Sequence, residues 1–597
     1  MANEQNLKMI PYGVADFNSF RVKNYYYVDK TRFIRNIEEK GDFLFLIRPR
    51  RFGKSLFLGI LESYYDIAFK DHFDFFFNGT EIYKNPTNEK NNYMILKLNF
   101  SLVYPDIQAL ENSFLNYIKE STSDFITKYA IQLNIDVEKA VKEVISRETP
   151  SDVMVTFLKY CKRKEHKLYV IIDEYDNFAN TIIAEAGDLE FRKITHGQGF
   201  LRAFFNVLKG GTTDTDAPIS RLFMTGVSPI TLDDVTSGFN IATNISLDSD
   251  LNEIMGFTVE EVETMIDYYR QTGKIKHSTP ELLEIMSRWY NHYRFSLYST
   301  PHVFNTVHVL YFLKEYMKNS LIPIEMIDRN IRIDYQKLKH LIVIDQKGTP
   351  TINGNFSRLC QIIENNSIHS RIVKGFPIDE LIDTENFTSL LYYFGLLTID
   401  GLDEENKAIL KIPNESIRRL YYDYIKDAYE NTGIFSLKLT AYESLVKEMA
   451  FNGDWEPLIE FLAARIDESL GLRDLITGEK SIQAMLNVYL GLSSLYLISS
   501  EKELNKGYAD LLMEPFLAQF PAIKFSYIIE IKYIKPTDYK KSGTRSNLIQ
   551  QLKEEAESQL IQYSKDKKLK EITGSTTLKK LVLIFAGTKL VYHHQLP

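Results

Sequence analysis

One short stretch constrains the fold of this chain more than any other part of its sequence. Residues 43–55 read FLFLIRPRRFGKS, and the apolar run that opens them is typical of a strand buried on both faces of a parallel sheet. The residues that follow carry apolar side chains at helical spacing, namely Leu56, Ile60, Tyr64 and Ile67. The sequence therefore predicts a buried strand, a short loop and a helix, which together form a unit of an α/β fold with a parallel sheet.

The loop between this strand and helix ends in Gly53-Lys54-Ser55, a sequence that closes many phosphate-binding loops. At the start of a helix, backbone N–H groups and the helix dipole favour a bound phosphate. We expect Lys54 to reach the outer phosphates of a nucleotide and Ser55 to offer its hydroxyl to Mg²⁺. An ordinary turn between a strand and a helix is the alternative interpretation.

The start of the loop departs from the usual motif, because Arg48 stands where a first glycine is expected. A loop entered through Arg48 still presents backbone N–H groups from Phe52 onward. Arg50 and Arg51 add positive charge near the phosphates. The missing glycine restricts the loop backbone, so we expect slow or partner-stimulated hydrolysis.

A second apolar strand, in KLYVIIDEYDN, ends in Asp173 and Glu174. A carboxylate at the tip of a buried strand is costly unless it meets a cation. We expect Asp173 to hold Mg²⁺ through water and Glu174 to orient or deprotonate the attacking water. A third strand, RLFMTGVSP, ends in Thr225, which is placed to sense the γ-phosphate, and YMILKLNFS supplies a further strand. This order fits an ATPase in which an extra strand lies between the lysine loop and the acidic strand.

These segments together resemble the AAA-ATPase-like family of bacterial proteins over about residues 9–300. The resemblance is carried by PYGVADFNSFRVKNYYYVDKTRFI, FLIRPRRFGKSLFL, VIIDEYDN and FMTGVSP. In that family the loop is similar to RPRRFGKS, so the resemblance implies that Arg48 is the usual residue at its position. It also implies a P-loop ATPase domain that binds ATP with Mg²⁺.

The segment after the predicted sheet is expected to form a helical lid over the nucleotide, residues 246–300. Its first helix, in MGFTVEEVETMIDYY, opens with a capping box from Thr258 to Glu261. Its end, RWYNHYRFS, is similar to the aromatic and arginine signature of the same family. Arg294, or else Arg288, is the candidate to contact a phosphate from the lid or from a neighbouring subunit. The alternative is an arginine that stacks on aromatic side chains for packing.

Residues 301–435 are predicted to form a helical and winged-helix-like region. Residues 387–425 are typical of a helix, a strand, a polar turn, a strand and a helix, which is the outline of a winged helix. The turn, DGLDEEN, is acidic and would be repelled by nucleic-acid phosphates. A structural or regulatory wing is therefore favoured over one that binds DNA.

A second group of candidate catalytic residues lies on two further predicted strands, within NKGYADLLMEPFLAQFPAIKFSYIIEIKYIK. Since side chains alternate along a strand, Glu530 and Lys532 share one face, and the turn between the strands can bring Asp510 beside them. Asp510 and Glu530 would bind one or two Mg²⁺ ions, and Lys532 would position the attacking water for phosphodiester hydrolysis. A half-exposed hairpin with a cross-strand ion pair is the alternative.

The helix predicted after these strands favours the catalytic interpretation. In NLIQQLKEEAESQLIQYSKD, the buried stripe consists of Leu548, Leu552, Ala556 and Leu560. Gln559 and Tyr563 lie one turn apart beside this stripe. Polar groups that point inward require partners, and a catalytic sheet supplies them.

The motifs Asp510, Glu530-x-Lys532 and Gln559-x-x-x-Tyr563 together resemble those of the PD-(D/E)XK nucleases, particularly the branch that follows AAA-ATPase-like domains. The resemblance covers about residues 475–590 and implies an α/β restriction-endonuclease-like domain, in which the glutamine and tyrosine orient the site or the substrate. An upstream acid usually helps to bind metal in such nucleases, and the candidates are Glu479 first and Glu501 second. The candidates for a basic rim along a phosphate backbone are Lys506, Lys535, Lys540, Lys541 and Arg545, with solvated surface side chains as the alternative.

The composition is that of a globular protein, with 44% hydrophobic and 25% charged residues. Two cysteines provide neither a disulfide framework nor a cysteine-rich zinc site, which fits a reducing cytoplasm. We find no secretory signal and no apolar run near the roughly 20 residues of a spanning helix, so we expect a cytoplasmic protein without a membrane partner. The net charge of -8 argues against indiscriminate coating of nucleic acid.

The predicted regions are a P-loop AAA-ATPase-like domain, a helical lid, a helical and winged-helix-like region, a helical linker and a nuclease-like domain, at 1–245, 246–300, 301–435, 436–474 and 475–597. The favoured function is an ATPase coupled to a metal-dependent nuclease that acts on DNA or RNA, in defence against mobile DNA or in its processing. We expect ATP and Mg²⁺ as cofactors, and a homo-oligomer or a protein partner. The alternative is a nucleotide-gated switch or assembly protein that binds nucleic acid or a partner without cutting.

Overall fold

The structure is a computed structural model. It describes residues 7–104, 106, 109–162, 164–177, 193–196, 199–213, 216–230, 241–328, 330, 354–377, 380–381, 383–431, 435–469, 478–505, 507–540 and 545–597. The chain divides into two compact units. The first comprises residues 1–320, 326–341 and 369–414, and the second comprises 321–325, 342–368 and 415–597.

The first unit is built on a parallel sheet of strands in the order β2-β3-β4-β1-β5. The strands are β1 (Phe43–Ile47), β2 (Tyr93–Asn99), β3 (Lys167–Asp173), β4 (Ile219–Gly226) and β5 (Thr243–Asn244). The strand β4 lies between the lysine-loop strand β1 and the acidic strand β3, and β2, which lies between the loop and β3 in the sequence, forms the edge of the sheet. The register pairs Leu46 with Thr225 and Asn99 with Asp173, so the carboxyl ends of these strands meet at one edge of the sheet.

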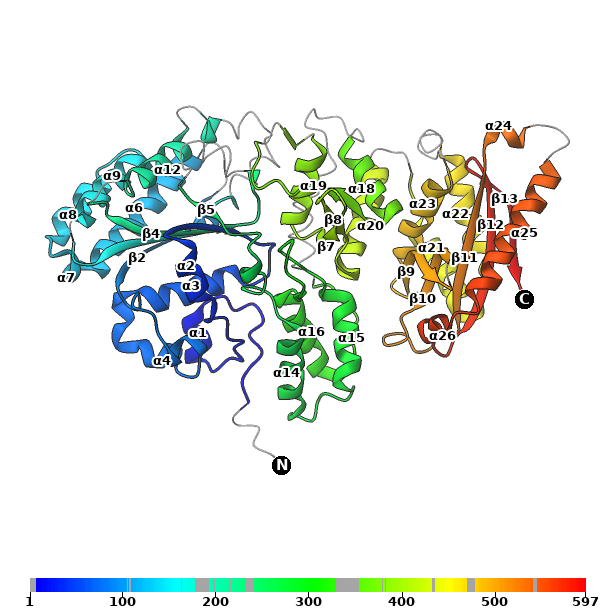
Figure 1. Cartoon of the computed structure of the whole chain (residues 1–597), viewed down its shortest axis with the longest axis horizontal. Coiled ribbons are helices and arrows are strands. Elements are labelled where there is room, and N and C mark those ends of the chain that lie inside the picture. The colour runs from blue at the N-terminus through cyan, green and yellow to red at the C-terminus, as the bar shows by residue number, and fades with distance from the viewer. Residues whose placement is uncertain are drawn as a thin grey trace. The chain divides into compact units, whose positions relative to one another are not determined.

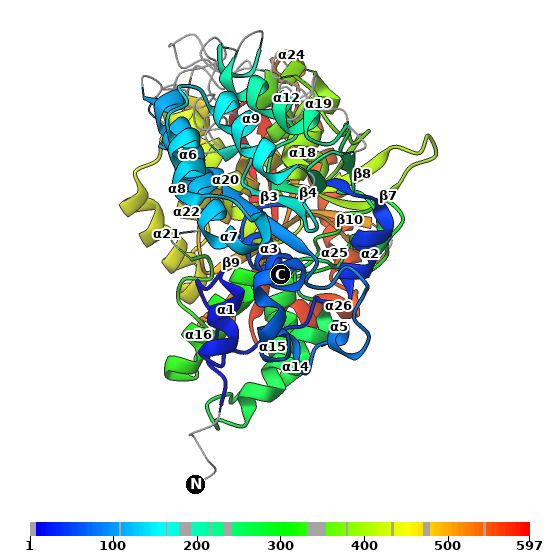
Figure 2. The same cartoon turned by 90° about the vertical axis from the view of Figure 1, so that its left-hand side faces the viewer.

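Helices cover both faces of this sheet (Figures 1 and 2). One face carries α1 (Phe17–Val22), α3 (Lys54–Tyr65) and α4 (Phe73–Phe77). The other carries α6 (Leu110–Lys128), α8 (Val137–Ile145), α9 (Pro150–Cys161) and α12 (Phe200–Gly210). The chain before β5 also forms α2 (Phe33–Lys40), α5 (Glu81–Lys84) and α7 (Ala130–Leu133). The predicted α/β fold with a parallel sheet is therefore confirmed.

The helix after the lysine loop differs from the expected one-sided pattern. Only one apolar stripe was predicted, but α3 is buried on nearly all sides, including at Phe57, Leu58 and Leu61. The helix also ends at Tyr65, and Ile67 belongs to a separate 3₁₀ turn. A helix that is apolar all round lies inside a core, which here is formed by the sheet and its neighbouring helices.

The segment that follows the sheet is helical, as predicted, and comprises α14 (Val259–Arg270), α15 (Thr279–Tyr290) and α16 (Thr306–Asn319). The capping box at the start of α14 is present: Glu261 N–H donates to the Thr258 hydroxyl, and Thr258 N–H donates to the Glu261 carboxylate. After α16, the first unit continues with α19 (Thr384–Tyr393) and the antiparallel strands β7 (Thr398–Leu402) and β8 (Ala408–Lys411). The strand β6 (Ile368–Ser370) pairs with β8.

The expected sequence of helix, strand, turn, strand and helix is present in α19, β7, β8 and α20 (Glu415–Asn431). The helix α20 belongs to the second compact unit, whereas the other three elements belong to the first. The winged-helix interpretation and the finer domain boundaries therefore remain predictions.

The second unit contains a mixed sheet in the order β13-β12-β11-β10-β9. Its strands are β9 (Tyr496–Leu504), β10 (Gly507–Pro515), β11 (Phe525–Ile534), β12 (Thr577–Ala586) and β13 (Lys589–Leu596). Only the β11–β12 pair is parallel. The helices are α18 (Gly354–Asn365), α20, α21 (Leu439–Asn452), α22 (Glu456–Glu468), α23 (Glu479–Gly491), α24 (Pro536–Tyr539), α25 (Arg545–Tyr563) and α26 (Lys567–Thr573). The predicted C-terminal α/β domain is confirmed.

The helix α25 packs on the sheet through the stripe expected from the sequence. Ala556 and Leu560 are fully buried in one cluster with Ile528 and Val582, and Leu548 and Leu552 pack against it. The strands β11 and β12 supply this face with every second side chain, which also places Glu530 and Lys532 on the side of α25.

Candidate functional site

The lysine loop leads from the end of β1 directly into α3. Gly53 has a φ of 99°, a backbone conformation that favours glycine, and α3 begins at the next residue. No side chain of the described residues caps this helix, which leaves the N–H groups of its first turn, from Lys54 to Leu56, for a ligand. The loop therefore offers the backbone donors that a phosphate requires.

The Lys54 side chain is buried, with 6% of its surface exposed. Its ammonium group donates to the carbonyl oxygens of Arg48 and Pro49, each at 3.0 Å. Burial lowers the pKa of Lys54, and the nearby Glu174 and Asp173 carboxylates oppose this shift. A phosphate at the loop would restore a charged partner to this ammonium group.

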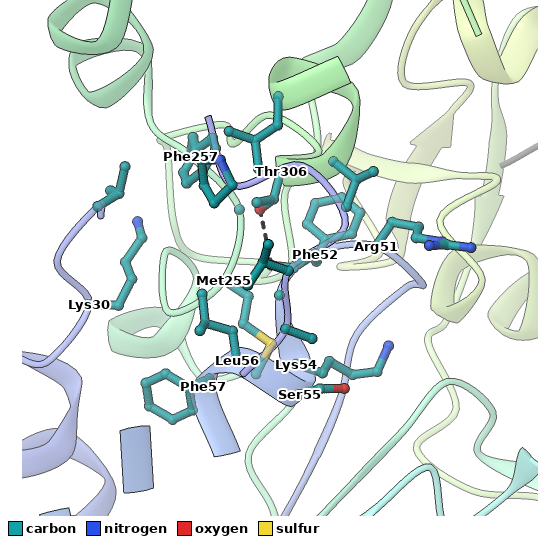
Figure 3. Close-up of a pocket in the computed structure, with 18 of the residues that line it drawn as sticks. Lys30, Arg51, Phe52, Lys54, Ser55, Leu56, Phe57, Met255, Phe257 and Thr306 are labelled. Carbon is teal, nitrogen blue, oxygen red and sulfur yellow. Dashed lines mark hydrogen bonds between the residues drawn. The ribbon is translucent and has the colours of Figure 1, made fainter. Parts of the chain in front are cut away.

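A cavity of about 520 Å³ adjoins the loop (Figure 3). Most of its wall is formed by residues within 11–15, 26–30, 50–57, 254–257 and 306–310, and Glu174 and Asn177 also line it. The predicted residues Arg50, Arg51, Phe52, Gly53, Lys54 and Ser55 all line it. The volume lies within the range of about 300 to 1,000 Å³ that is usual for small-molecule sites.

Sequence reasoning missed the residues that close the far side of this cavity. Lys30 lies across the cavity from Lys54 (Figure 3) and is held by both carboxylate oxygens of Glu261, at 2.8 and 2.7 Å. The same carboxylate completes the capping box of α14. Lys30 follows a tyrosine-rich segment, Tyr25 to Tyr27, but forms no recognised motif with it, so only the tertiary structure connects Lys30 with the loop.

The acidic residues at the end of β3 are close to the loop, as predicted. Glu174 lines the cavity and has a left-handed backbone, with a φ of 49°. Burial raises its pKa, and the Lys54 ammonium group opposes the rise. Asp173 is buried, and its Oδ1 atom has no hydrogen-bond partner among the described residues. Such an unsatisfied oxygen fits a role as acceptor for a hydrated cation.

Asp176, which the sequence analysis did not select, fixes the tips of two strands together. Its carboxylate accepts hydrogen bonds from the N–H groups of Val227 at 3.0 Å and Ser228 at 2.6 Å. Gly226 has no room for a side chain, since a Cβ atom there would lie 2.4 Å from Tyr175. This junction holds the acidic strand end beside β4.

Two residues of the predicted nucleotide site, Thr225 and Arg294, do not line the cavity. Thr225 is fully buried, and its hydroxyl donates to the Leu46 carbonyl at 2.9 Å; it does not line the cavity. Arg294 also lies outside the cavity wall and is 9% exposed. Its Nε and Nη2 atoms have no hydrogen-bond partner within the described part of the chain.

Arg48, at the position of the expected glycine, has a structural role in this chain. Its guanidinium group is buried and donates to the carbonyl oxygens of Ile47, Ser246 and Leu251, at 2.9, 2.7 and 3.0 Å. It also lies 4.4 Å from the centre of the Phe295 ring. The arginine therefore joins the end of β1 to the segments that follow the sheet, and it leaves the phosphate side of the loop clear.

The second candidate site lies where β10 and β11 cease to pair. Their ladder is regular from Met513 to Leu511, which is opposite Ile529. At the next residue, the Asp510 carboxylate accepts the Ile531 N–H at 2.7 Å, in place of a backbone acceptor. Gln483 of α23 donates to the Asp510 carbonyl at 2.7 Å and fixes this residue from another element.

The structure brings Glu530 and Lys532 beside Asp510. Lys532 Nζ lies 3.1 Å from Glu530 Oε1 and 3.7 Å from Glu555 Oε1. Burial raises the pKa of Asp510 and of Glu530, and the negative charge of Asp510 adds to the rise at Glu530. Glu530 Oε2 is buried without a hydrogen-bond partner among the described residues. Burial disfavours the charged form of both carboxyl groups, and a bound cation would stabilise that form beyond what Lys532 alone provides.

The helix residues predicted for this site are also near it. The Tyr563 hydroxyl donates to the Tyr508 carbonyl at 3.0 Å, and burial raises the pKa of Tyr563 to about 12, with Glu530 and Asp510 adding to the rise. Gln559 has a buried Oε1 atom without a partner in the described residues. Glu479, the first residue of α23, has a pKa raised by burial and interacts electrostatically with Lys532.

The donor set suits a hard divalent cation. Among the described residues, no three His, Cys, Asp or Glu side chains are gathered closely enough to hold a metal ion. Mg²⁺, however, usually keeps several waters and binds through one or two carboxylates together with substrate phosphates. Asp510 and Glu530 fit that arrangement, and the unsatisfied Glu530 oxygen is available for it.

The register of β9 and β10 places Glu501 opposite Asp510, between the pairs Ala509–Lys502 and Leu511–Ser500. Glu501 has a left-handed backbone with a φ of 51°. Both candidates for the upstream acid, Glu479 and Glu501, raise the pKa of Asp510 electrostatically.

Of the predicted basic rim, Lys506 and Lys541 lie outside the described residues. No helix in the described part of the chain is both long and apolar enough to cross a membrane.

Comparison with known proteins matches two parts of the chain to family models. Residues 11–236 match the family described as predicted AAA-ATPase, and residues 477–595 match the PD-(D/E)XK nuclease superfamily. A curated relative from Azotobacter chroococcum mcd 1, named "Uncharacterized protein in vnfD 5'region", is 27% identical over 299 residues. The match covers 48% of this chain and 49% of the relative, so the chain spans about half the length of that relative.

Among solved structures, the Orc1 protein of Aeropyrum pernix in complex with DNA is similar at 8% sequence identity, with 68% of this chain and 96% of that chain covered. The TM-score of 0.27 is too low to define a shared fold.

Proposed function

Because the chain contains a predicted AAA-ATPase domain and a domain of the PD-(D/E)XK nuclease superfamily, we propose that it binds and hydrolyses ATP and uses this reaction to control a metal-dependent nuclease acting on DNA or RNA. The nuclease assignment is carried by the convergence of Asp510, Glu530 and Lys532 beside α25. The ATPase assignment is supported by the cavity that both Lys54 and Glu174 line.

In the first site, the uncapped start of α3 and Lys54 bind the phosphates, and Ser55 lies at the position of the hydroxyl that contacts Mg²⁺ in such loops. Glu174 faces the same cavity and is placed to orient the attacking water. Burial raises its pKa, which favours proton uptake from that water.

In the second site, Asp510 and Glu530 would hold the divalent cation. A cation bound there supplies Lewis-acid stabilisation of the phosphodiester. The Lys532 ammonium group orients the attacking water and offsets negative charge on the phosphate. The Ile531 N–H and Gln483 fix Asp510, and Tyr563 packs behind the strand through its bond to the Tyr508 carbonyl.

Incubation of the purified protein with labelled single- and double-stranded DNA and RNA, with and without ATP and Mg²⁺, tests this function. Cleavage that depends on the cation and responds to ATP is the expected result. Intact nucleic acid under every condition, with Mn²⁺ in place of Mg²⁺ as well, would contradict the nuclease assignment. A role in defence against mobile DNA or in its processing rests on analogy with other ATPase–nuclease pairs.

A nucleotide-gated switch that binds nucleic acid or a partner without cutting is the second candidate. It is favoured by the loop itself, where Lys54 already donates to two carbonyl oxygens of its own loop. Nucleotide binding must break these bonds, which suits a slow switch as well as a turnover enzyme. ATP-dependent binding of nucleic acid without cleavage would support this function.

The stability of the second unit in chelator should fall as the pH rises from about 4 to about 8. Burial raises the pKa of Asp510 from 3.8 to about 7 and that of Glu530 from 4.5 to about 8. A carboxyl with a raised folded-state pKa contributes fully to stability below its unfolded pKa, and this contribution is lost as the pH rises through the folded pKa.

Trp455 reports on this unit, since the other of the two tryptophans, Trp289, lies in the first. We therefore expect Asp510→Asn, in a Trp289→Phe background, to raise the melting temperature measured by Trp455 fluorescence, and to do so more at the upper end of this pH range. Mg²⁺ should stabilise only the protein that keeps Asp510. An effect of the asparagine that does not change with pH would disprove this prediction.

We further expect ATP hydrolysis to require a second copy of the chain or a partner, since Arg294 does not line the cavity. Arg294→Ala should lower turnover by about 100-fold, as is typical for one lost charge contact in a transition state, with ATP binding unchanged. Light scattering should give a larger mass with ATP than with ADP. A monomer with full ATPase activity that is indifferent to Arg294→Ala would refute this expectation.

A further inference from the structure

The phosphate loop is held from behind by the start of α16. The carbonyl oxygen of Arg51 accepts the Val307 N–H at 3.3 Å, and that of Phe52 accepts the Thr306 hydroxyl at 3.1 Å. The Arg50 carbonyl accepts the Asn305 side-chain amide at 3.5 Å. Three consecutive loop carbonyls are therefore bonded to three consecutive residues that lie about 250 positions away in the sequence.

These contacts hold a strained part of the loop. Arg51 has a φ of 70°, in the left-handed region that a residue with a side chain rarely adopts. Such conformations persist only where the surrounding structure over-determines them. The Val307 N–H bonds the carbonyl of Arg51 itself, and the Gly256 N–H bonds the next carbonyl, that of Phe52, at 3.2 Å. Phe52 is in turn buried between Tyr293 and Phe295, with ring centres 4.9 and 5.3 Å away.

The direction of the carbonyls sets the direction of the phosphate donors. In a trans peptide unit the C=O and the following N–H point to opposite sides. Carbonyls drawn toward α16 therefore turn the N–H groups of residues 51–53 away from it. Arg51, Phe52 and Gly53 line the cavity, and the uncapped first turn of α3 continues this row of donors. Figure 3 shows Thr306 above the loop and Lys54 with Ser55 below it.

We propose that Thr306 is a positioning residue for the phosphate site, which fixes the loop in its binding conformation, and that α16 transmits nucleotide occupancy to α14 and α15, the helices of the predicted lid. The proposal rests on the proposed binding of a nucleotide at Lys54. It assigns the loop a second role: its non-glycine residues serve as the attachment point for α16.

The lid is connected to this attachment point. The Asn305 N–H donates to the Tyr290 carbonyl at 2.9 Å, and the Tyr290 ring lies 5.1 Å from His308 of α16. Trp289, next to Tyr290 in α15, is 2% exposed. A shift of α16 should therefore change the surroundings of this tryptophan.

Three variants test the proposal. Thr306→Val keeps the shape of the side chain and removes the hydroxyl, and Thr306→Ser keeps the hydroxyl. Thr264→Val is the control, since among the described residues the Thr264 hydroxyl bonds the Glu260 carbonyl, within α14 itself. The measurements are dissociation constants for ATP, ADP and AMP, and Trp289 fluorescence in a Trp455→Phe background.

We expect Thr306→Val to weaken binding of ATP and ADP by about three- to tenfold, the usual range for one hydrogen bond, and to leave AMP binding unchanged. The reason is that the backbone N–H groups of such loops hold phosphates beyond the α-phosphate. AMP carries only the α-phosphate, so it should not respond to a change in the loop. The serine variant and Thr264→Val should behave as the wild type. The change in Trp289 fluorescence on ATP addition should be smaller in Thr306→Val.

The outcomes separate the proposal from the function on which it rests. If the wild type binds ATP and Thr306→Val binds it equally well, the positioning role is wrong and the nucleotide site stands. Equal weakening of AMP, or failure of serine to restore binding, would indicate general damage to the fold and would also overturn the role. A wild type that binds none of the three nucleotides would overturn the nucleotide site itself.

Discussion

Replacing Asp510 with alanine should abolish metal-dependent cleavage of nucleic acid, with a loss of more than about 1,000-fold in rate. The substitution removes a metal ligand and an electrostatic partner together, and loss of one such contact already lowers the rate by about 100- to 1,000-fold. The loss should be accompanied by loss of Mn²⁺ binding in calorimetry, since Asp510 and Glu530 are the carboxylates that we propose hold the cation. Removal of the cation with chelator should make the wild type equally inactive.

Two further variants sharpen this test. Lys532→Ala should keep the metal and lose most of the rate, because its ammonium group is 3.1 Å from Glu530 and acts on the reacting groups rather than on the cation. Glu514→Gln removes a carboxylate from the same strand, β10, four residues along, and should leave both metal binding and cleavage intact. Cleavage that persists in Asp510→Ala would assign the activity to another site or to a contaminant.

The elements that carry this site could be predicted because their signals are local. A strand has a period of two, which placed Glu530 and Lys532 on one face, and the helix period placed Gln559 one turn before Tyr563. The capping box of Thr258 and Glu261 could be predicted for the same reason, because it lies within four consecutive residues. The bond between the Asp510 carboxylate and the Ile531 N–H joins residues 21 apart and has no sequence signature.

Arg48 illustrates the limit of motif reasoning. The motif showed a missing glycine and the family resemblance implied that an arginine is usual there. Neither predicted that its guanidinium group bonds the carbonyl oxygens of Ser246 and Leu251, about 200 residues away. Lys30 and Thr306 were missed for the same reason, since each reaches the cavity through tertiary packing. Local patterns predict which face of an element is buried, but they do not predict what it is buried against.

The nucleotide site should depend on Lys54 most of all. Lys54→Ala should weaken ATP binding by about 3 to 4 kcal/mol, or more than about 100-fold, so that a titration with fluorescent ATP detects no binding at micromolar protein. The side chain is buried beside the loop, where one charge has a large effect because water cannot replace it. Lys84→Ala, an exposed lysine of α5, is the matched control and should bind as the wild type.

Glu174 separates binding from hydrolysis within the same cavity. Its carboxylate lies at the end of β3, near Lys54, and burial raises its pKa, which suits an acceptor of a proton from water. Glu174→Gln keeps the shape and removes the charge, so ATP should still bind, and more tightly if the lost carboxylate had repelled the phosphates. Turnover should stop, because no other acid lines the cavity among the described residues. Equal ATP affinity in wild type and Lys54→Ala would refute the assignment of the loop, whereas full turnover by Glu174→Gln would refute only the assignment of the base.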